Sequence, residues 1–203
     1  MRDDGRAALR HLIELGPSDE RVRERDALID ELDTAIAAQN AGEEAALATK
    51  LAAVTKALQA AAAEQRAAML AAVERAEAAR GDEARVALLL EAFSICALGE
   101  VVAHDDFADE ETARRAVEYK HRIVGALDAI GSGHRAALER LLDSPFAGVR
   151  ASAGAHLLNA GLERERVVPL LQQIEKEVLS SAGWTAFWAL APDEHGAWLD
   201  DGI

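Results

Sequence analysis

The longest stretch of this chain without a helix-breaking residue is residues 43–80, which contain neither glycine nor proline. The stretch reads EEAALATKLAAVTKALQAAAAEQRAAMLAAVERAEAAR, and alanine, leucine and charged residues dominate it. These residue types favour the helix, whereas glycine and proline are the residues that interrupt one. The sequence therefore predicts one long helix over residues 43–80, and the rest of the fold must be built around it.

The first half of this stretch has the spacing of a helix that packs against another helix. Leu47, Leu51, Val54 and Leu58 are separated by four, three and four residues, which is the seam of a coiled coil over about two heptads. Beyond them the seam becomes alanine-rich and contains Gln65. Alanine allows helices to approach closely but buries little area, so we expect an antiparallel bundle rather than an extended coiled coil.

The composition of the whole chain predicts an all-α fold. Half of the 203 residues are apolar, only 4% are aromatic, and there are four prolines. The clusters of β-branched and aromatic residues that strands need are missing. The character of the sequence changes near Gly81, which predicts an N-terminal long-helix segment over residues 1–80 and a helical-repeat domain over residues 81–203, with one continuous domain as the alternative.

The sequence of the C-terminal half predicts short helices arranged in pairs. Residues 134–142 form the first helix of a pair, and a second helix runs to Asn159, with Ser144 expected as its N-cap and Pro145 at its first position. Gly154 lies inside this second helix, which predicts that another helix approaches closely there. A second pair of helices follows, and each has apolar residues at helical spacing, over residues 167–178 and 184–191.

The turn between the first two helices carries the most specific motif in the chain. The stretch LLDSPFAGVRASAGAHLL, residues 141–158, resembles the turn of a HEAT repeat. Residues of about 85–192 resemble a small bacterial HEAT-like domain family that occurs beside polymorphic toxins. The resemblance implies an α-solenoid, an immunity role, and turn residues that bond between neighbouring repeats. Asp143, Pro145 and Arg150 occupy those turn positions.

The charge of the chain restricts its partners. The formal net charge is −14. Nucleic acids and anionic membranes attract positively charged proteins, so neither is expected as a partner, whereas a basic protein would be attracted. No apolar stretch is expected to reach the length of a membrane span, and the N-terminus does not resemble a signal peptide, so a cytoplasmic location is expected. Cys96 is the only cysteine and lies in an apolar run, which predicts a buried thiol.

An acidic segment follows the most apolar helix and is the first candidate site. One interpretation is a solvated loop that caps the next helix and meets a basic protein surface. The alternative is a metal site that His121 would complete, although no metal-binding motif fixes its geometry. The segment contains His104, Asp105, Asp106, Asp109, Glu110 and Glu111.

Three tryptophans near the C-terminus form the second candidate site. Trp184 and Trp188 are one helical turn apart and share a face, and Trp198 follows Pro192. Tryptophan is common at the centres of protein interfaces. On a last amphipathic helix it more often completes the core, and this is the favoured interpretation for Trp184 and Trp188, with partner contact as the alternative.

The sequence contains no recognised catalytic arrangement. None of the six histidines has a nucleophile or carboxylate at a catalytic spacing, and His156 is interpreted as structural. The leading hypothesis is therefore an acidic protein-binding immunity protein that occludes the active site of a basic bacterial toxin, with no enzyme activity, metal or other cofactor. The alternatives are a helical adaptor or homodimeric scaffold, and a metal-dependent enzyme that uses the segment from His104 to Glu111.

Overall fold

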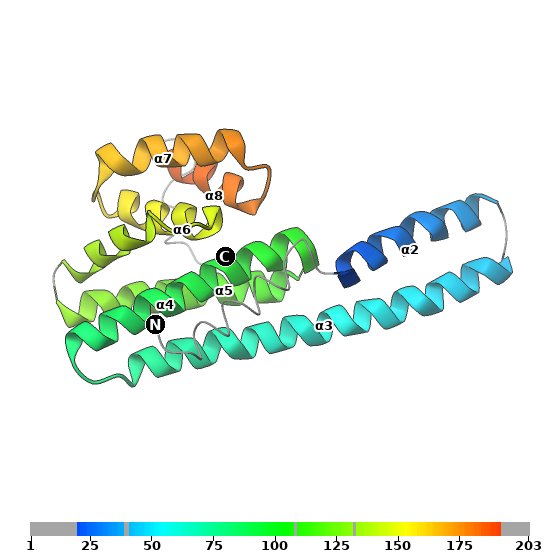
Figure 1. Cartoon of the computed structure of the whole chain (residues 1–203), viewed down its shortest axis with the longest axis horizontal. Coiled ribbons are helices and arrows are strands. Elements are labelled where there is room, and N and C mark those ends of the chain that lie inside the picture. Colours follow the sequence, from blue (N-terminus) through cyan, green and yellow to red (C-terminus); the bar gives the residue numbers. More distant parts are fainter. Residues whose placement is uncertain (1–19, 39–40, 108, 132, 192–203) are drawn as a thin grey trace.

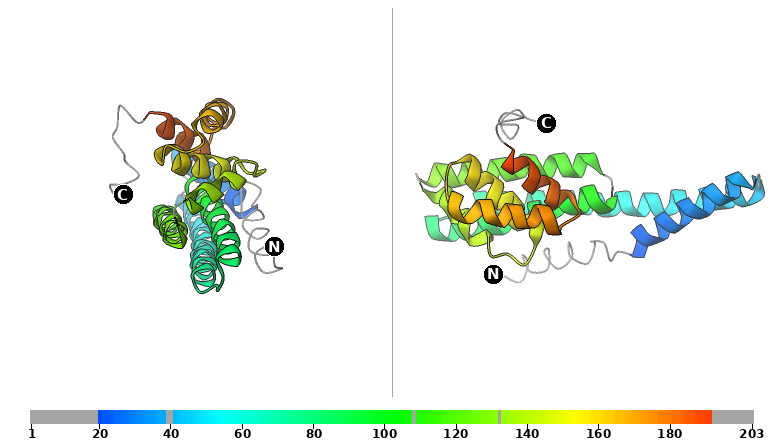
Figure 2. Two further views of the ribbon diagram at one scale, coloured as in Figure 1. Left: turned by 90° about the vertical axis from the view of Figure 1, so that its left-hand side faces the viewer. Right: turned by 90° about the horizontal axis from the view of Figure 1, so that it is seen from above.

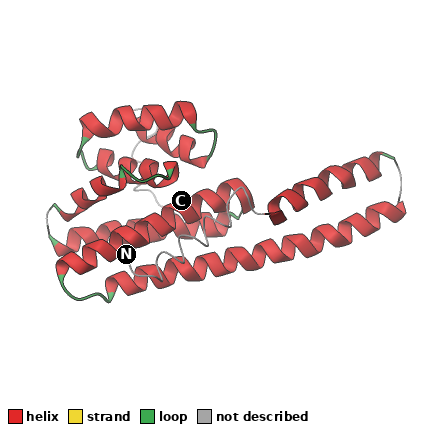
Figure 3. Cartoon of the chain, in the orientation of Figure 1, coloured by secondary structure: helices red, strands yellow, loops and turns green. Residues whose placement is uncertain are grey.

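The computed structural model describes residues 20–38, 41–107, 109–131 and 133–191, and every structural statement below concerns these residues. They fold entirely as helices and connecting turns, as the composition predicted (Figure 3). The α-helices are α2 (Glu20–Ala37), α3 (Ala41–Glu77), α4 (Asp82–Val102), α5 (Glu110–Ile130), α6 (Ala147–Asn159), α7 (Arg164–Glu177) and α8 (Ser181–Leu190). A π-helical turn, η1 (Ala103–Phe107), extends α4, and a 3₁₀ helix, η2 (His134–Leu141), precedes α6.

The long helix predicted from the breaker-free stretch is α3. It has 37 residues, which corresponds to a length of about 55 Å. Its first half forms an antiparallel hairpin with α2 that extends beyond the rest of the molecule (Figure 1). Leu47, Val54 and Leu58 of the predicted seam are buried there against Leu28 and Ala35 of α2. The prediction of a bundled helix is confirmed.

The second half of α3 belongs to the main core. Met69 and Val73 are fully buried in the same cluster as residues of α4, α5, α6, α7 and α8. The core therefore does not divide at Gly81, the predicted boundary between segments. Gly99 of α4 explains why α3 lies so close, since a Cβ there would come within 2.6 Å of Met69 Sδ. Gln65 Nε2 donates to the Gly99 carbonyl oxygen at the same contact, at 3.1 Å.

The central helix α4 corrects one expectation from the sequence. Residues Asp82–Asp105 are long and apolar enough to cross a membrane by length and composition, although no such stretch was expected. Most of this stretch is buried inside the protein, between α3 and α5 on one side and the C-terminal helices on the other. Phe93, Ile95 and Cys96 have no exposed surface, so the apolar length of α4 serves the core.

The C-terminal helices form a layer over α4 and α5. Figures 1 and 2 show α6, α7 and α8 stacked over the half of the molecule that lies away from the α2 hairpin. Gly154 of α6 lies where predicted, because a Cβ there would be 3.2 Å from Leu171 Cδ2 and 3.3 Å from Val167 Cγ1 of α7. The glycine permits the close packing of α6 on α7.

The turn before α6 differs from the prediction in its details. The segment before it is a 3₁₀ helix rather than an α-helix, and α6 begins at Ala147, after both Ser144 and Pro145. Ser144 does not cap the helix. Its hydroxyl accepts a bond from the amide of Phe146 at 3.3 Å, and Phe146 itself occupies the N-cap position. A serine hydroxyl that accepts from the amide two residues later stabilises a turn. Here the turn precedes the helix, which begins at Ala147.

Candidate functional site

A wide groove separates α5 from the C-terminal pair α7 and α8. Its volume is about 1190 Å³. We call it the acidic groove and define it by its lining: Glu100, His104, Asp105, Glu110, Ala113, Arg114, Val117, Glu118, His121, Glu175, Val178, Leu179, Ser180, Ser181, Gly183, Trp184, Thr185, Phe187 and Trp188. The acidic segment and the tryptophan helix, which the sequence offered as two separate candidate surfaces, thus meet at one site.

One wall of the acidic groove is a single face of α5. Its lining residues there follow helical spacing for three turns, at positions 110, 113, 114, 117, 118 and 121. This face is available because α5 packs on α4 and α3 with a different stripe, which includes Ala116, Ile123 and Leu127. The exposed wall is therefore apolar along its middle and charged at its edges.

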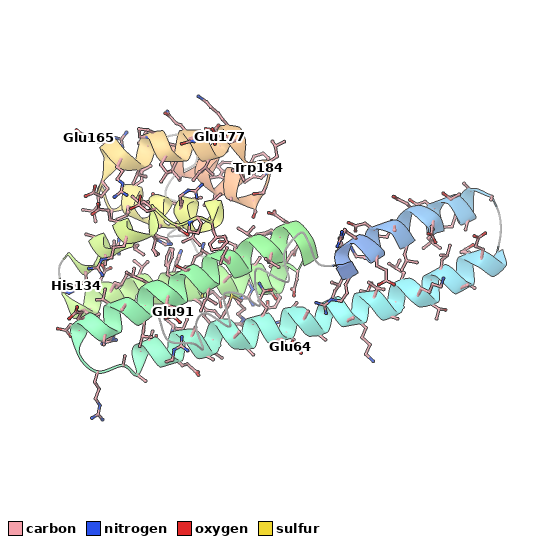
Figure 4. All side chains as sticks on the ribbon, viewed as in Figure 1. Glu64, Glu91, His134, Glu165, Glu177 and Trp184 are labelled. Carbon is pink, nitrogen blue, oxygen red and sulfur yellow. The ribbon has the colours of Figure 1, made fainter. Side chains whose placement is uncertain are left out.

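The opposite wall is α8, and here the favoured interpretation of Trp184 as a core residue is wrong. Trp184 is 64% exposed and Phe187 is 37% exposed, while Trp188 is half-buried. Their rings stack edge to face, with centroids 5.8 Å apart for Trp184 and Phe187 and 5.3 Å apart for Phe187 and Trp188. Figure 4 shows Trp184 projecting from α8.

The small residues of α8 explain why its aromatic rings face the groove. Ala182, Gly183, Ala186 and Ala189 are the buried residues of the helix, and they lie against α6 and α7. A Cβ on Gly183 would come within 2.1 Å of the Val178 carbonyl oxygen. Such close packing leaves no space for an aromatic ring on that side. The helical spacing of these small residues is the sequence signal that would have identified the buried face.

The acidic segment divides into residues that hold the fold and residues that face the groove. Asp109 is the N-cap of α5, accepting from the Thr112 amide at 3.1 Å, and it pairs with Arg66 at 2.8 Å. The prediction that this segment caps the next helix is confirmed. Glu111 pairs with Arg114 and Arg115. Asp105 accepts from the Ser181 amide at 2.9 Å, which joins the segment to the start of α8.

These bonds change the ionisation of two carboxyl groups. Burial alone raises the pKa of Asp109, but the bonds from Thr112 and Arg66 outweigh it, and the pKa lies below its usual value. Bonds from Arg114 and Arg115 lower the pKa of Glu111. Both groups are therefore charged at neutral pH and already paired. His104, Asp105 and Glu110 are the members of the acidic segment that line the groove. The side chain of Asp106 and residue Trp198 lie outside the described part of the structure.

A buried ion pair lies beneath the groove. The Lys120 ammonium of α5 donates to the Glu100 carboxylate of α4 and to the Ser152 hydroxyl of α6, the latter at 3.1 Å. The side chains of Lys120 and Glu100 are only 6% and 13% exposed. The pair ties three helices together directly below the groove, which Glu100 also lines. Sequence reasoning missed it, although Lys120 falls on the buried stripe of α5.

His156 lies half-buried in an aromatic stack, as its structural interpretation expected. Its ring lies edge to face against Phe93 of α4 and His121 of α5, with centroids 5.6 Å and 5.5 Å apart. Burial is the main reason why the pKa of His156 falls to about 3, and the nearby charge of Lys120 lowers it further, as do His121 and Arg135. The ring is neutral at physiological pH.

This neutral histidine makes stability depend on pH. In the unfolded chain His156 binds a proton below its ordinary pKa of 6.5, whereas in the folded protein it does so only near pH 3. Since the unfolded state binds more protons in that window, the free energy of unfolding falls as the pH drops from 6.5 toward 3. We expect His156→Leu to flatten this dependence, measured by urea unfolding at pH 7, 6, 5 and 4. An unchanged slope in the variant would contradict the assignment.

The repeat-turn residues hold neighbouring helices rather than a ligand. Asp143 accepts from Arg166 of α7 at 2.8 Å. This bond connects the turn between η2 and α6 with α7, the helix that follows α6. Arg150 donates to the Ser144 carbonyl oxygen at 2.7 Å, within its own turn. Pro145 is exposed in the bend before α6. These contacts are structural, and the three residues lie outside the groove.

The remaining candidate chemistry is limited within the described residues. No three histidine, cysteine, aspartate or glutamate side chains among them gather as a metal site would require. Cys96 is a buried free thiol, and burial raises its pKa to about 12. A thiol in this state is a weak nucleophile, because the thiolate is the reactive form.

The lining of the acidic groove carries an excess of carboxylates over cationic side chains. Five carboxylates line it, from Glu100, Asp105, Glu110, Glu118 and Glu175, and Arg114 is its one arginine or lysine. Glu100 is paired with Lys120, and Glu118 is paired with Arg114 and Arg115. Among the lining residues, Asp105, Glu110 and Glu175 are therefore the carboxylates without an ion pair to a described residue. Glu118, Glu175 and Phe187 were not identified from the sequence as site residues.

Comparisons with known proteins found no relative of this chain. No protein-family model, curated protein or solved structure matches the chain. The resemblance of residues of about 85–192 to a HEAT-like family therefore stays a prediction from the sequence.

Proposed function

We propose that this protein binds another protein through the acidic groove, and that its partner is a basic bacterial toxin domain whose active site it occludes. The observation that carries the proposal is the convergence of exposed aromatic rings with the carboxylates of Asp105, Glu110 and Glu175 on one groove. Interfaces are enriched in tryptophan at their centres, and complementary charge accelerates association and suppresses wrong partners.

The role as an immunity protein draws on two further features. Residues of about 85–192 resemble a HEAT-like family that occurs beside toxins, and the net charge of −14 suits a basic partner. Occlusion needs no catalytic group on this chain, because an inhibitor acts by covering a surface. A HEAT-like arrangement of the C-terminal helices and a cytoplasmic location belong to the same proposal.

The experiment is co-expression with the product of the neighbouring gene, scored by growth, together with the dissociation constant of the purified pair. We expect the wild-type chain to restore growth. We expect Trp184→Ala to weaken binding by about 30-fold and to lose protection, which corresponds to about 2 kcal/mol for an interface hot spot. Since Trp184 is exposed, its loss should leave the free energy of unfolding within about 0.5 kcal/mol of the wild-type value.

A matched control separates the groove from other apolar surface. Ile36 of α2 is 50% exposed and lies outside the groove, so Ile36→Ala should bind as the wild type does. If Ile36→Ala loses binding and Trp184→Ala keeps it, the contact lies on the α2 hairpin, and the scaffold alternative is favoured. If the neighbouring product is not toxic, the immunity proposal fails.

A further inference from the structure

The shape of the acidic groove restricts what part of a partner can enter it. Its two walls are both helices, and the wall on α5 runs from Glu110 to His121. These twelve residues span about 17 Å of helix, or three turns. The packing of α5 on α3 and α4, and of α8 on α6 and α7, holds these walls apart. The groove thus lies between two helical walls, one of which offers three turns of helix.

The chemistry of the walls changes across the groove. Ala113 and Val117 on α5 face the groove together with the rings of Trp184 and Trp188 on α8. Carboxylates flank this apolar floor, with Glu110 on the α5 side and Glu175 on the α7 side. Glu118 also lies on the α5 side, where it is paired with Arg114 and Arg115. A complementary ligand has one apolar face and lysine or arginine on both flanks of it.

The walls also determine the backbone conformation that fits. They are built mainly from side chains of helices, with the link at residues 178–180 as the exception. The described residues contain no strand whose edge could pair with an extended peptide. An extended segment would place its amide and carbonyl groups over apolar side chains without partners, which costs free energy for each group. A helix satisfies these groups internally, and helix-in-groove binding is a recurring mode of recognition.

We propose that the acidic groove binds one amphipathic basic α-helix of about three turns from the partner protein. This inference rests on the proposed function, since it names the segment by which the partner enters the groove. The apolar face of that helix packs on Trp184 and Val117, and its lysines or arginines pair with Glu110 and Glu175. The rest of the partner then lies over the mouth of the groove.

The test uses the full chain and three synthetic peptides of about 14 residues. The first is a leucine–lysine peptide with leucines at helical spacing. The second has the same composition with leucines and lysines alternating, so that a helix has no apolar face. The third peptide has the sequence of the first, except that glutamate replaces each lysine. Binding is measured by fluorescence anisotropy at about 0.15 M ionic strength, and helix formation by circular dichroism.

We expect the first peptide to bind and to become helical, the second to bind about tenfold more weakly, and the third not to bind. The double variant Glu110→Gln/Glu175→Gln should bind the first peptide about fivefold more weakly than the wild type does. Glu44→Gln/Glu64→Gln makes the same change of charge on α3 and should bind as the wild type does. Figure 4 shows Glu64 on the far side of α4 and α5 from Trp184.

Two results would overturn the inference. One is equal binding of the alternating peptide, and the other is an equal loss of binding in the α3 control, since that would mean diffuse attraction rather than a helix in the groove. Either result leaves the proposed function standing if growth rescue still depends on Trp184. If that rescue also fails, both the helix and the proposed function are rejected.

Discussion

Replacing Lys120 with methionine is expected to lower the free energy of unfolding by about 3 kcal/mol. The substitution keeps the length of the side chain but removes the charge that neutralises Glu100, which is 13% exposed beneath the groove. It also removes a donor to the Ser152 hydroxyl. An uncompensated buried carboxylate must either be desolvated at a cost or take up a proton. Urea unfolding at pH 7 measures the loss.

Two controls identify the cause of that loss. The double variant Lys120→Met/Glu100→Met removes both charges, and we expect it to recover most of the lost stability, because apolar replacement of a whole buried pair is often nearly neutral. Arg122→Met breaks the pair between Arg122 and Glu77, whose side chains are 44% and 29% exposed. That surface pair is expected to contribute at most about 1 kcal/mol. An equal loss in Arg122→Met and Lys120→Met would contradict the argument.

The fold was predictable from the sequence where its information is local. The absence of breakers over residues 43–80 correctly predicted α3, and the heptad spacing of Leu47, Val54 and Leu58 correctly predicted its contact with a second helix. The glycine at position 154 correctly predicted a close helix contact. Each of these inferences depends on the residues within one helix, and their spacing can be read from the sequence alone.

The candidate site was predictable only as separate parts. The sequence identified Asp105 and Trp184 but could not show that α5 and α8 face each other, because the bond from Ser181 to Asp105 joins residues 76 positions apart. Lys120 was missed because a lysine on a helix is usually exposed, and burial depends on the partner supplied by α4. Trp184 was assigned to the core because large apolar residues usually lie there. On α8 the small residues occupy the packed face instead.

Gly183 is the residue that fixes the position of the aromatic wall, and Gly183→Ala is expected to lower the free energy of unfolding by about 2 kcal/mol. The added Cβ would come within 2.1 Å of the Val178 carbonyl oxygen, which is a backbone atom and cannot rotate away. The start of α8 must then move away from α7. Because Trp184 directly follows Gly183, this movement displaces the ring that lines the acidic groove.

The matched control is Gly125→Ala on the exposed side of α5. A Cβ at Gly125 meets no atom within 4 Å, so alanine gains helix propensity without a clash and should raise the free energy of unfolding by about 0.5–1 kcal/mol. The same chemical change thus has opposite signs at two helical positions. Thermal or urea unfolding of the two variants measures the difference. If both substitutions stabilise the protein, then α8 is free to shift and the aromatic wall of the groove is not fixed by Gly183.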